Sequence, residues 1–387
     1  MTRVLMVIYG FGYGGIRACI QNYVTYMNRT EFHIDIYVYG ADSSPFRQQM
    51  EGMGCKMYFD PDNDIATNHI LTFVRKLTNF IRKGHYDVVH AHCNLISAWV
   101  TLAAMMGGAK VRIAHSHSTS HFSGRFLQNL WSYLRRGIIS LTATHKLACG
   151  QLAGETMYGE KTAFIILQNG INVNRFLKCD KAKVWQLREK LNIPEGARVY
   201  ANVTRMDPQK NHLFAIEIFR EIHRIDPTAV FIYGGVTPPM NSTVEQVKAK
   251  IEEYGLQPWT RYVGAFMDIQ NLYHLSDLWI YCSAYEGLPF GPIELQAASV
   301  PTLASDVITS EMDLGLGLIH FLSLNDSPVK WAQKACEIVK PSIDERTIKA
   351  AFVSHHFDIQ QNILALEAIY RGKEKRTSLV KSKKWNQ

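Results

Sequence analysis

The sequence predicts an α/β protein of two doubly wound domains, in which helices cover both faces of a parallel sheet. Short apolar runs typical of buried strands alternate with segments of helical periodicity from the first residues onward. A turn signal at Gln168–Gly170 interrupts the alternation, and a second series of the same kind starts near Val199. The length of 387 residues is sufficient for two domains that each have a core.

The first domain is expected to comprise residues 1–170. Its helices are predicted at Ile16–Met27 and His69–Ile81, where apolar residues recur with the period of one helix face. No small-residue cleavage site follows the first apolar run, so we interpret this run as a buried strand and not as a secretory signal. The predicted strands are Val4–Tyr9, His33–Tyr39, Val88–His92 and Val111–His117.

The second domain is expected to comprise residues 180–355. Its predicted strands are Val199–Val203, Val230–Tyr233, Leu278–Cys282 and Pro301–Ala304, and its predicted helices are Leu213–Ile225, Val244–Tyr254 and Ile293–Ala298. Two doubly wound domains are expected to bind a ligand in a cleft between them, at the carboxyl ends of both sheets.

Composition and charge narrow the class of protein. The net charge is +8, but residues 371–387 contain seven Lys or Arg and one Glu, which leaves about +2 for the rest of the chain. The fold itself is therefore not predicted to bind nucleic acid. The seven cysteines include no C-x-x-C pair, which favours a reducing cytoplasm. The longest apolar stretch, Leu95–Ala109, is shorter than the roughly 20 residues of a membrane span.

Two basic segments leave a peripheral contact with the inner face of the membrane open. The tail 373–387 is expected to be solvated, and its alternative role is attraction to anionic lipid. The segment Arg125–Arg136 combines basic residues with Phe126, Leu127, Leu130, Trp131 and Leu134. We interpret it as an amphipathic helix that packs its apolar residues on the first domain, and a second lipid contact is the alternative.

Three motifs could carry chemistry, and the first is the glycine-rich stretch Gly10–Gly15. It lies between a predicted strand and a predicted helix, where backbone amides can approach an anion. A dinucleotide fingerprint also needs an acidic residue at the end of the second strand, but Asp35 is too early and Asp42 too late. The loop therefore suits phosphorylated ligands in general, and a tight strand-to-helix turn is the alternative.

The second motif is the pair Arg205 and Lys210, in the loop after the first strand of the second domain. Two cations at the carboxyl end of a parallel sheet suit a diphosphate. A basic loop that is merely solvated is the alternative.

The third motif is the segment from Glu286 to Glu294. Glu286 is expected in a loop and Glu294 on the following helix, where both carboxylates can accept from sugar hydroxyls. The amides of Phe290 and Gly291, at the start of that helix, are expected to point at an anion.

The segment 284–299 resembles the E-x7-E signature of retaining glycosyltransferase family 4, whose GT-B fold has two Rossmann-like domains and an interdomain cleft. The resemblance extends through most of the chain, and bacterial capsular and exopolysaccharide enzymes are the most similar members. The other segments that carry it are Gly14–Ile16, Tyr86–His92, Asn169–Phe176, the pair Arg205 and Lys210, and Asp277–Pro289. The resemblance also implies that a terminal helix within residues 356–372 returns to the first domain.

The resemblance implies a hexosyl transfer, with retention, from a nucleotide diphosphate sugar, with uridine as the base, to a carbohydrate or lipid-linked glycan acceptor. No cofactor and no metal are expected. Arg205 and Lys210 would neutralise the donor diphosphate, Glu294 would accept from ribose, and Glu286 would bind the transferred sugar. Phe290 and Gly291 would donate amides, and Gly14 and Gly15 would contact the donor from the first domain. His117 occupies the position of the active-site histidine, and His115 is the rival assignment.

Three alternatives remain at this point. The D-x-D sequence in Asp60–Asp64 is typical of metal sites in another glycosyltransferase fold, but it lies in a proline-containing loop and is expected to be solvated. The pairs His90/His92 and His115/His117 each fall on one face of a strand, so a zinc-dependent hydrolase is the second class. A non-catalytic protein that binds sugar nucleotides is the third.

Overall fold

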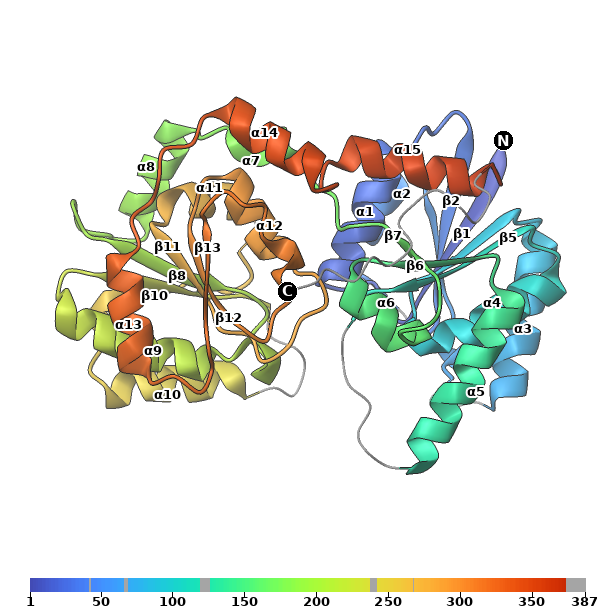
Figure 1. The fold of residues 1–387 in the computed structure, drawn as a ribbon, viewed down its shortest axis with the longest axis horizontal. Coiled ribbons are helices and arrows are strands. Elements are labelled where there is room, and N and C mark those ends of the chain that lie inside the picture. The colour runs from blue at the N-terminus through green and yellow to red at the C-terminus, as the bar shows by residue number, and fades with distance from the viewer. Residues whose placement is uncertain (42, 66–68, 119–125, 237–241, 267, 374–387) are drawn as a thin grey trace. The chain divides into compact units, whose positions relative to one another are not determined.

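The chain folds into two compact α/β units in the computed structural model, which describes all residues except 42, 66–68, 119–125, 237–241, 267 and 374–387. One unit consists of residues 1–171 together with 356–387, and the other of residues 172–355. Figure 1 shows helices on both faces of the sheet in each unit, so the predicted α/β class with two doubly wound domains is confirmed. Most of the predicted basic tail lies outside the described residues.

The first unit is built on a seven-stranded sheet in the order β3-β2-β1-β4-β5-β6-β7, with every neighbouring pair parallel. The strands are β1 Thr2–Ile8, β2 Phe32–Val38, β3 Lys56–Phe59, β4 Val88–Ala91, β5 Val111–Ser116, β6 His145–Ala148 and β7 Ile165–Ile166. The side chains of residues 4–7 are fully buried, because helices cover the central strand on both faces.

The described part of the chain segment that forms this sheet also contains helices and short helical turns. They are α1 Gly15–Tyr26, α2 Arg47–Gly52, α3 Ile70–Gly84, α4 Ser97–Gly107, α5 Phe126–Thr142, α6 Gln151–Tyr158 and the short η1 Pro61–Asn63, and a further turn, η2 Asn94–Ile96, precedes α4. In α3 the buried residues Phe73, Leu77 and Ile81 recur at helical spacing, and Arg82 and Lys83 lie in the last turn, where cations are favoured.

The second unit has a six-stranded parallel sheet in the order β10-β9-β8-β11-β12-β13. Its strands are β8 Val199–Val203, β9 Val230–Gly234, β10 Thr260–Tyr262, β11 Leu278–Tyr281, β12 Thr302–Ser305 and β13 Ile319–Leu322. Its helices are α7 Val173–Leu177, α8 Lys181–Lys190, α9 His212–Ile225, α10 Thr243–Glu253, α11 Ile269–Leu275, α12 Phe290–Ala297, α13 Pro328–Glu337 and α14 Glu345–Ser354, with the short turns η3 Pro208–Lys210, η4 Gln257–Trp259 and η5 Ser310–Met312.

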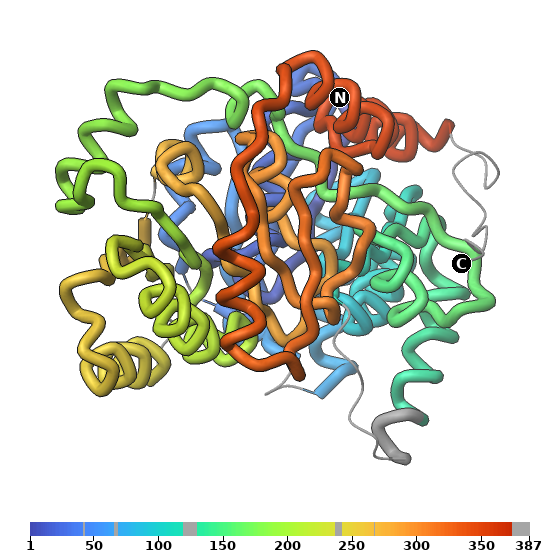
Figure 2. The backbone as a smooth tube through the Cα atoms, turned by 60° about the vertical axis from the view of Figure 1, so that its left-hand side comes forward, coloured from blue at the N-terminus to red at the C-terminus, as the bar shows by residue number. Residues whose placement is uncertain are grey.

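The last helix, α15 (Ile359–Tyr370), belongs to the first unit although it follows the second in sequence. Figures 1 and 2 both show it, in red, beside the blue N-terminal segment. Arg371 forms an ion pair with Glu31 at 2.6 Å, and Glu367 accepts from the Asn28 amide at 2.8 Å. These polar contacts, together with the buried Tyr370, hold the end of the chain on this unit.

Several elements were not predicted from the sequence. The strands β3, β6, β10 and β13 have four residues or fewer, but β4, β11 and β12 are equally short and were predicted, so length alone does not explain the omission. The stretch Lys178–Lys190 has few apolar residues, yet it contains α8. The apolar stretch after Leu95 forms α4, and no helix among the described residues is long and apolar enough to cross a membrane.

The interpretation of the Arg125–Arg136 segment is wrong in one respect. The segment does form part of a helix, α5, but Leu130, Trp131 and Leu134 are 60%, 48% and 48% exposed and do not pack on the unit. The inner side of the helix instead has Ser132, Ile139 and Thr142. Periodicity identifies an apolar stripe but does not say which side of the helix faces the core. Arg125 and the side chains of Phe126 and Leu127 lie outside the described structure.

Each sheet reverses its strand order at one point, between β1 and β4 in the first unit and between β8 and β11 in the second. At such a switch point the loops after the two strands diverge, and ligands of doubly wound sheets bind there. The loops after β8 and β11 contain Arg205, Lys210 and Glu286, and the loops after β1 and β4 contain Gly14 and His92.

Candidate active site

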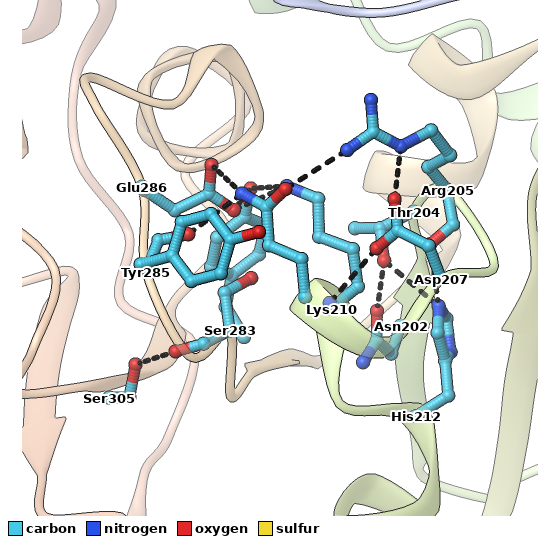
Figure 3. A network of polar contacts seen from close by, with 12 residues as sticks. Asn202, Thr204, Arg205, Asp207, Lys210, His212, Ser283, Tyr285, Glu286 and Ser305 are labelled. Atoms are coloured by element: carbon cyan, nitrogen blue, oxygen red, sulfur yellow. Dashed lines mark hydrogen bonds and ion pairs between the residues drawn. The ribbon is translucent and has the colours of Figure 1, made fainter. Parts of the chain in front are cut away.

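The loops that follow β8 and β11 lie against each other in the second unit. The Ala284 amide donates to the Gln209 carbonyl at 2.8 Å, which joins the two loops by their backbones. This contact brings Arg205 and Lys210, on the first loop, close to Glu286 on the second (Figure 3). The topology of the sheet therefore gathers three of the predicted donor-binding side chains.

Lys210 and Glu286 form an ion pair that is largely shielded from water, with side-chain exposures of 13% and 10%. The Tyr281 hydroxyl lies 3.2 Å from the Lys210 Nζ and 3.3 Å from a Glu286 carboxylate oxygen. Burial, and after it the Glu286 charge, raises the pKa of Tyr281 far above its usual range. Tyr281 is therefore a neutral hydroxyl that orients both charged groups.

Arg205 is connected to the same pair through Gln209. The Arg205 guanidinium donates to the Gln209 side-chain oxygen at 3.0 Å and also pairs with Asp207. The Gln209 amide donates in turn to the Tyr285 carbonyl at 2.8 Å and lies 3.4 Å from Glu286. Arg205 is 37% exposed, so its charge remains accessible to a ligand at the end of this chain of contacts.

A second set of polar contacts holds the loop after β8 in place. The Thr204 hydroxyl donates to the Asn202 side chain at 2.9 Å and lies 3.1 Å from the His212 Nε2. Burial lowers the pKa of His212 to about 4, so this imidazole stays neutral at cellular pH. A Cβ on Gly235 would lie 1.7 Å from the Thr204 carbonyl oxygen, and Gly235 has a φ of +139°. Only glycine allows β9 to approach the loop this closely.

Glu294 is the fifth residue of α12. Its carboxylate accepts from the Tyr273 hydroxyl at 2.7 Å, and its charge contributes to the raised pKa of Tyr281. The helix begins at Phe290, and no side chain caps its N-terminus. The amides of Phe290 and Gly291 therefore belong to a helix end that favours an anion.

In the first unit, the glycine-rich loop leads directly into α1. Gly14 precedes the helix with a φ of 155°, a conformation that favours glycine, and Gly15 is the first helical residue. No side chain caps this helix end either. The loop therefore has the backbone of an anion-binding turn, as its sequence suggests.

Four histidines form a buried cluster where β4 and β5 end. Rings two residues apart on one strand are 4.0 Å apart for His90 and His92, and 4.1 Å for His115 and His117. Between the strands, His90 Nε2 lies 3.1 Å from His115 Nδ1, and His92 Nδ1 lies 2.8 Å from His117 Nε2. The Tyr370 hydroxyl lies 2.8 Å from His90 Nδ1 and closes the outer end of the cluster.

Burial separates the two candidates for the active-site histidine. His115 has no exposed surface, whereas His117 is only partly buried, so a ligand can reach His117 but not His115. Burial lowers the pKa of all four histidines, that of His117 to about 3. The cluster is therefore neutral in the folded protein, and His117 is suited to hydrogen bonding rather than to carrying a charge.

The same cluster is the basis of the metal alternative. His90, His92 and His115 can each offer one nitrogen, all within 4.8 Å of one another, and no carboxylate joins the group in the described part of the chain. Both nitrogens of His90 already have partners. A divalent ion there would therefore have no carboxylate to offset its charge.

Comparison with known proteins identifies the chain. A family model described as "Glycosyltransferase Family 4" matches residues 13–174, and a second, described as "Glycosyl transferases group 1", matches residues 183–314. The chain belongs to glycosyltransferase family 4. It is 28% identical over 375 residues to "Putative glycosyltransferase EpsF" of Bacillus subtilis, an alignment that covers 95% of this chain and 96% of the relative.

A second relative of this family 4 glycosyltransferase is an Escherichia coli protein, "UDP-Gal:alpha-D-GlcNAc-diphosphoundecaprenol alpha-1,3-galactosyltransferase". It is 23% identical over 285 residues, which cover 70% of this chain and 72% of the relative. Among solved structures, Anabaena HepE in complex with UDP and glucose has a TM-score of 0.77 and 17% identity, and the match covers 96% of this chain and 100% of that one. These likenesses confirm the GT-B fold, and they do not favour the hydrolase alternative.

Three residues of the site were missed by the sequence analysis. Gln209 lies between the two predicted cations in sequence and bridges Arg205 to Glu286, and Tyr281 and Tyr273 each position one carboxylate. Gln209 is next to Lys210 in sequence and could have been considered with it. The tyrosines lie on β11 and α11, where aromatic residues are ordinarily part of the core, so no sequence signal separates them from packing residues.

Proposed function

We propose that this family 4 glycosyltransferase transfers a hexosyl unit from a UDP-sugar to a carbohydrate acceptor, with retention of anomeric configuration. The observation that carries the proposal is the joined set Arg205, Gln209, Glu286 and Lys210 at the switch point of the second sheet. It combines two cations for a diphosphate with the Glu286 carboxylate for hydroxyls. The uridine base is supported by the relatives and neighbours whose names include UDP.

The two cations have partners that a donor would have to displace in part. Lys210 pairs with Glu286 and Arg205 with Asp207, so the charges of these four groups cancel. We propose that the diphosphate takes the place of Glu286 at the Lys210 ammonium, while Glu286 turns to the hydroxyls of the sugar. The ion pair of the free enzyme thus keeps each group oriented and avoids an unpaired charge in a shielded site.

Stabilisation of the leaving group then provides the catalysis. As the bond between the anomeric carbon and the phosphate oxygen breaks, negative charge grows on the diphosphate, where Arg205, Lys210 and the amides of Phe290 and Gly291 are positioned to stabilise it. Glu294 holds the ribose. No carboxylate is proposed as a nucleophile. With two cations on this loop, we propose that turnover needs no divalent metal and persists in excess chelator.

Gly14, Gly15 and His117 stay predicted donor contacts from the first unit. Gly14 and Gly15 would donate amides. His117, neutral and partly buried, would donate or accept one hydrogen bond with the transferred sugar. His92 positions it at 2.8 Å.

For the acceptor, we propose a lipid-linked glycan at the inner face of the membrane, in the synthesis of an exopolysaccharide or capsule. The support is that the E. coli relative is named for a diphosphoundecaprenol acceptor and the B. subtilis relative is an Eps protein. The basic residues after Arg371 would add electrostatic attraction to that surface, so their effect should disappear at high salt.

A screen of sugar nucleotides by thermal shift tests the donor assignment. UDP-sugars should raise the unfolding temperature of the protein, and the best of them should release UDP in the presence of an acceptor. Proton NMR of the product then reports whether configuration is retained. If UDP-sugars bind but nothing is transferred to any glycan acceptor, a non-catalytic binding protein is the better description. If no nucleotide binds, the proposal is wrong.

A further inference from the structure

The helix α5 presents its apolar side to solvent. Leu130, Trp131, Tyr133, Leu134 and Leu141 are exposed by 60%, 48%, 65%, 48% and 83%. At 100° per residue they cover one continuous arc of the helix, with Leu130, Leu134 and Leu141 in a line at its centre. We call these five residues the α5 face. Figure 1 shows α5 beside α4, with its N-terminal turns extending beyond the sheet.

The buried side of α5 combines Ile139 with polar residues. The Thr142 hydroxyl donates to the Ile138 carbonyl and lies 2.7 Å from the Thr101 hydroxyl, and Ser132 is buried as well. Single exposed leucines are common on protein surfaces, but a contiguous apolar patch on a helix marks a contact with another body. The orientation of α5 therefore indicates an interaction surface and not a piece of the core.

The charge around the α5 face narrows the choice of partner. Residues 88–154, which include α4, β5, α5 and β6, contain no Asp or Glu, and they contain six Lys or Arg. Arg135 and Arg136 belong to α5 itself, at the flanks of the face, and Arg136 donates to the Thr156 and Met157 carbonyls at 2.9 and 3.3 Å. A second copy of the chain docked on this face would bring the same positive charge against it, which costs free energy. A surface that carries negative charge would instead be attracted to this positively charged region.

We propose that the α5 face docks on an anionic phospholipid bilayer. Leucines enter the boundary between headgroups and acyl chains, Trp131 and Tyr133 lie at the interface, where amphipathic rings are favoured, and the excess of basic side chains in residues 88–154 attracts lipid phosphates. The face from Leu130 to Leu141 is about 17 Å long, enough for a shallow contact. This docking rests on the proposed function for its purpose. It would hold the first unit at the surface in which a lipid-linked glycan is anchored.

Sedimentation with vesicles tests the surface without donor or acceptor. Full-length protein is mixed with vesicles of phosphatidylglycerol and phosphatidylcholine, or of phosphatidylcholine alone, at low and high salt. The variant L130S/W131S/L134S removes three exposed side chains. The matched control L71S/L364S removes leucines that are 83% and 65% exposed on α3 and α15. We expect the α5 variant to lose at least about tenfold in partition to anionic vesicles, because it no longer buries three large apolar side chains in the bilayer. The control should change by less than about twofold.

Two further measurements test the α5 face independently of the triple variant. The single variant L134E places a negative charge at the centre of the face and should weaken binding even if the triple variant folds poorly. Brominated lipid should quench tryptophan emission in the wild type and quench it less in W131F. Deletion of 374–387 separates the tail, whose contribution should be the part lost at high salt.

Equal binding of wild type and both α5 variants would overturn the proposal. So would a change from dimer to monomer in L130S/W131S/L134S with vesicle binding intact, since the face would then be a contact between copies. Turnover on a soluble acceptor should be unchanged in these variants. A wild type that binds vesicles but transfers no sugar would contradict the proposed function alone, and one that transfers sugar but binds no vesicles would contradict this inference alone.

Discussion

The two units build their polar clusters at equivalent places in two similar sheets, but with opposite chemistry. In the second unit, the loops after β8 and β11 join two cations to two carboxylates around Gln209, and part of this network is exposed. In the first, four imidazoles gather where β4 and β5 end, and burial keeps them neutral. A doubly wound sheet thus fixes where a site lies, and the loop residues decide whether it holds charge.

The largest effect on turnover is expected from the loss of Lys210 in the second unit. The variant Lys210→Ala should lose at least about a hundredfold in kcat/KM, because a charge-assisted contact to the diphosphate is worth about 1.5–3 kcal/mol and grows in the transition state. It also leaves Glu286 shielded without its cation, so the unfolding temperature should fall. Lys183→Ala, on α8, removes an exposed lysine and is the control. Near-normal turnover in Lys210→Ala would contradict the assignment.

A fall in pH should next destabilise the first unit through its histidine cluster, and the second unit through the single buried His212. The folded-state pKa of each clustered histidine is lowered, so the unfolded chain binds protons that the folded chain excludes. Stability should therefore be full above the unfolded pKa of about 6.5 and decrease as pH falls below it, down toward pH 3 for His117, by about 1.4 kcal/mol per pH unit for each such group. Urea denaturation between pH 7.5 and 5.0 measures the slope. His115→Gln should reduce it, and the exposed His355→Gln should not.

The two glutamates of the second unit should have separate effects on nucleotide binding. Glu294→Ala should weaken the binding of UDP alone by about tenfold, as expected for a lost hydrogen bond to a charged acceptor. Glu286→Gln removes the charge that competes with phosphate for Lys210, so UDP should bind as tightly as before or more tightly, while sugar transfer is impaired. Titration calorimetry with UDP measures both. An equal loss of UDP affinity would show that the two roles are not distinct.

Substitution of Gln209 should reduce turnover less than substitution of its neighbours Lys210 and Glu286. It contacts Arg205 and Glu286 by hydrogen bonds, each worth about 0.5–1.5 kcal/mol net, so Gln209→Ala should reduce kcat/KM by about three- to tenfold. Gln246→Ala, at an exposed position on α10, is the control. An effect as large as that of Lys210→Ala would mean that Gln209 contacts the donor directly and does not only position its neighbours.

The sequence predicted what depends on short-range periodicity and on the order of elements. Alternating strands and helices were sufficient for the fold class, and the strand period placed His90 with His92 on one face. Arg205, Lys210 and Glu286 were predicted as donor-binding residues with the help of the family resemblance, and the structure brings them together because parallel neighbours end at one edge of a sheet. Gln209 and Tyr281 could not be found, since their roles depend on contacts between loops. The outward side of α5 depends on tertiary packing, on which periodicity gives no information.

Arg205 and Lys210, the cations in the loop after β8, are proposed to bind the donor diphosphate. Calorimetric titration of a UDP-sugar into the wild type and into Arg205→Ala/Lys210→Ala tests this assignment most directly. We expect saturable binding to the wild type and a loss of at least about a hundredfold in affinity in the double variant, which should remain folded because the other contacts of both loops persist. Equal affinity of the two proteins for the UDP-sugar would contradict this assignment.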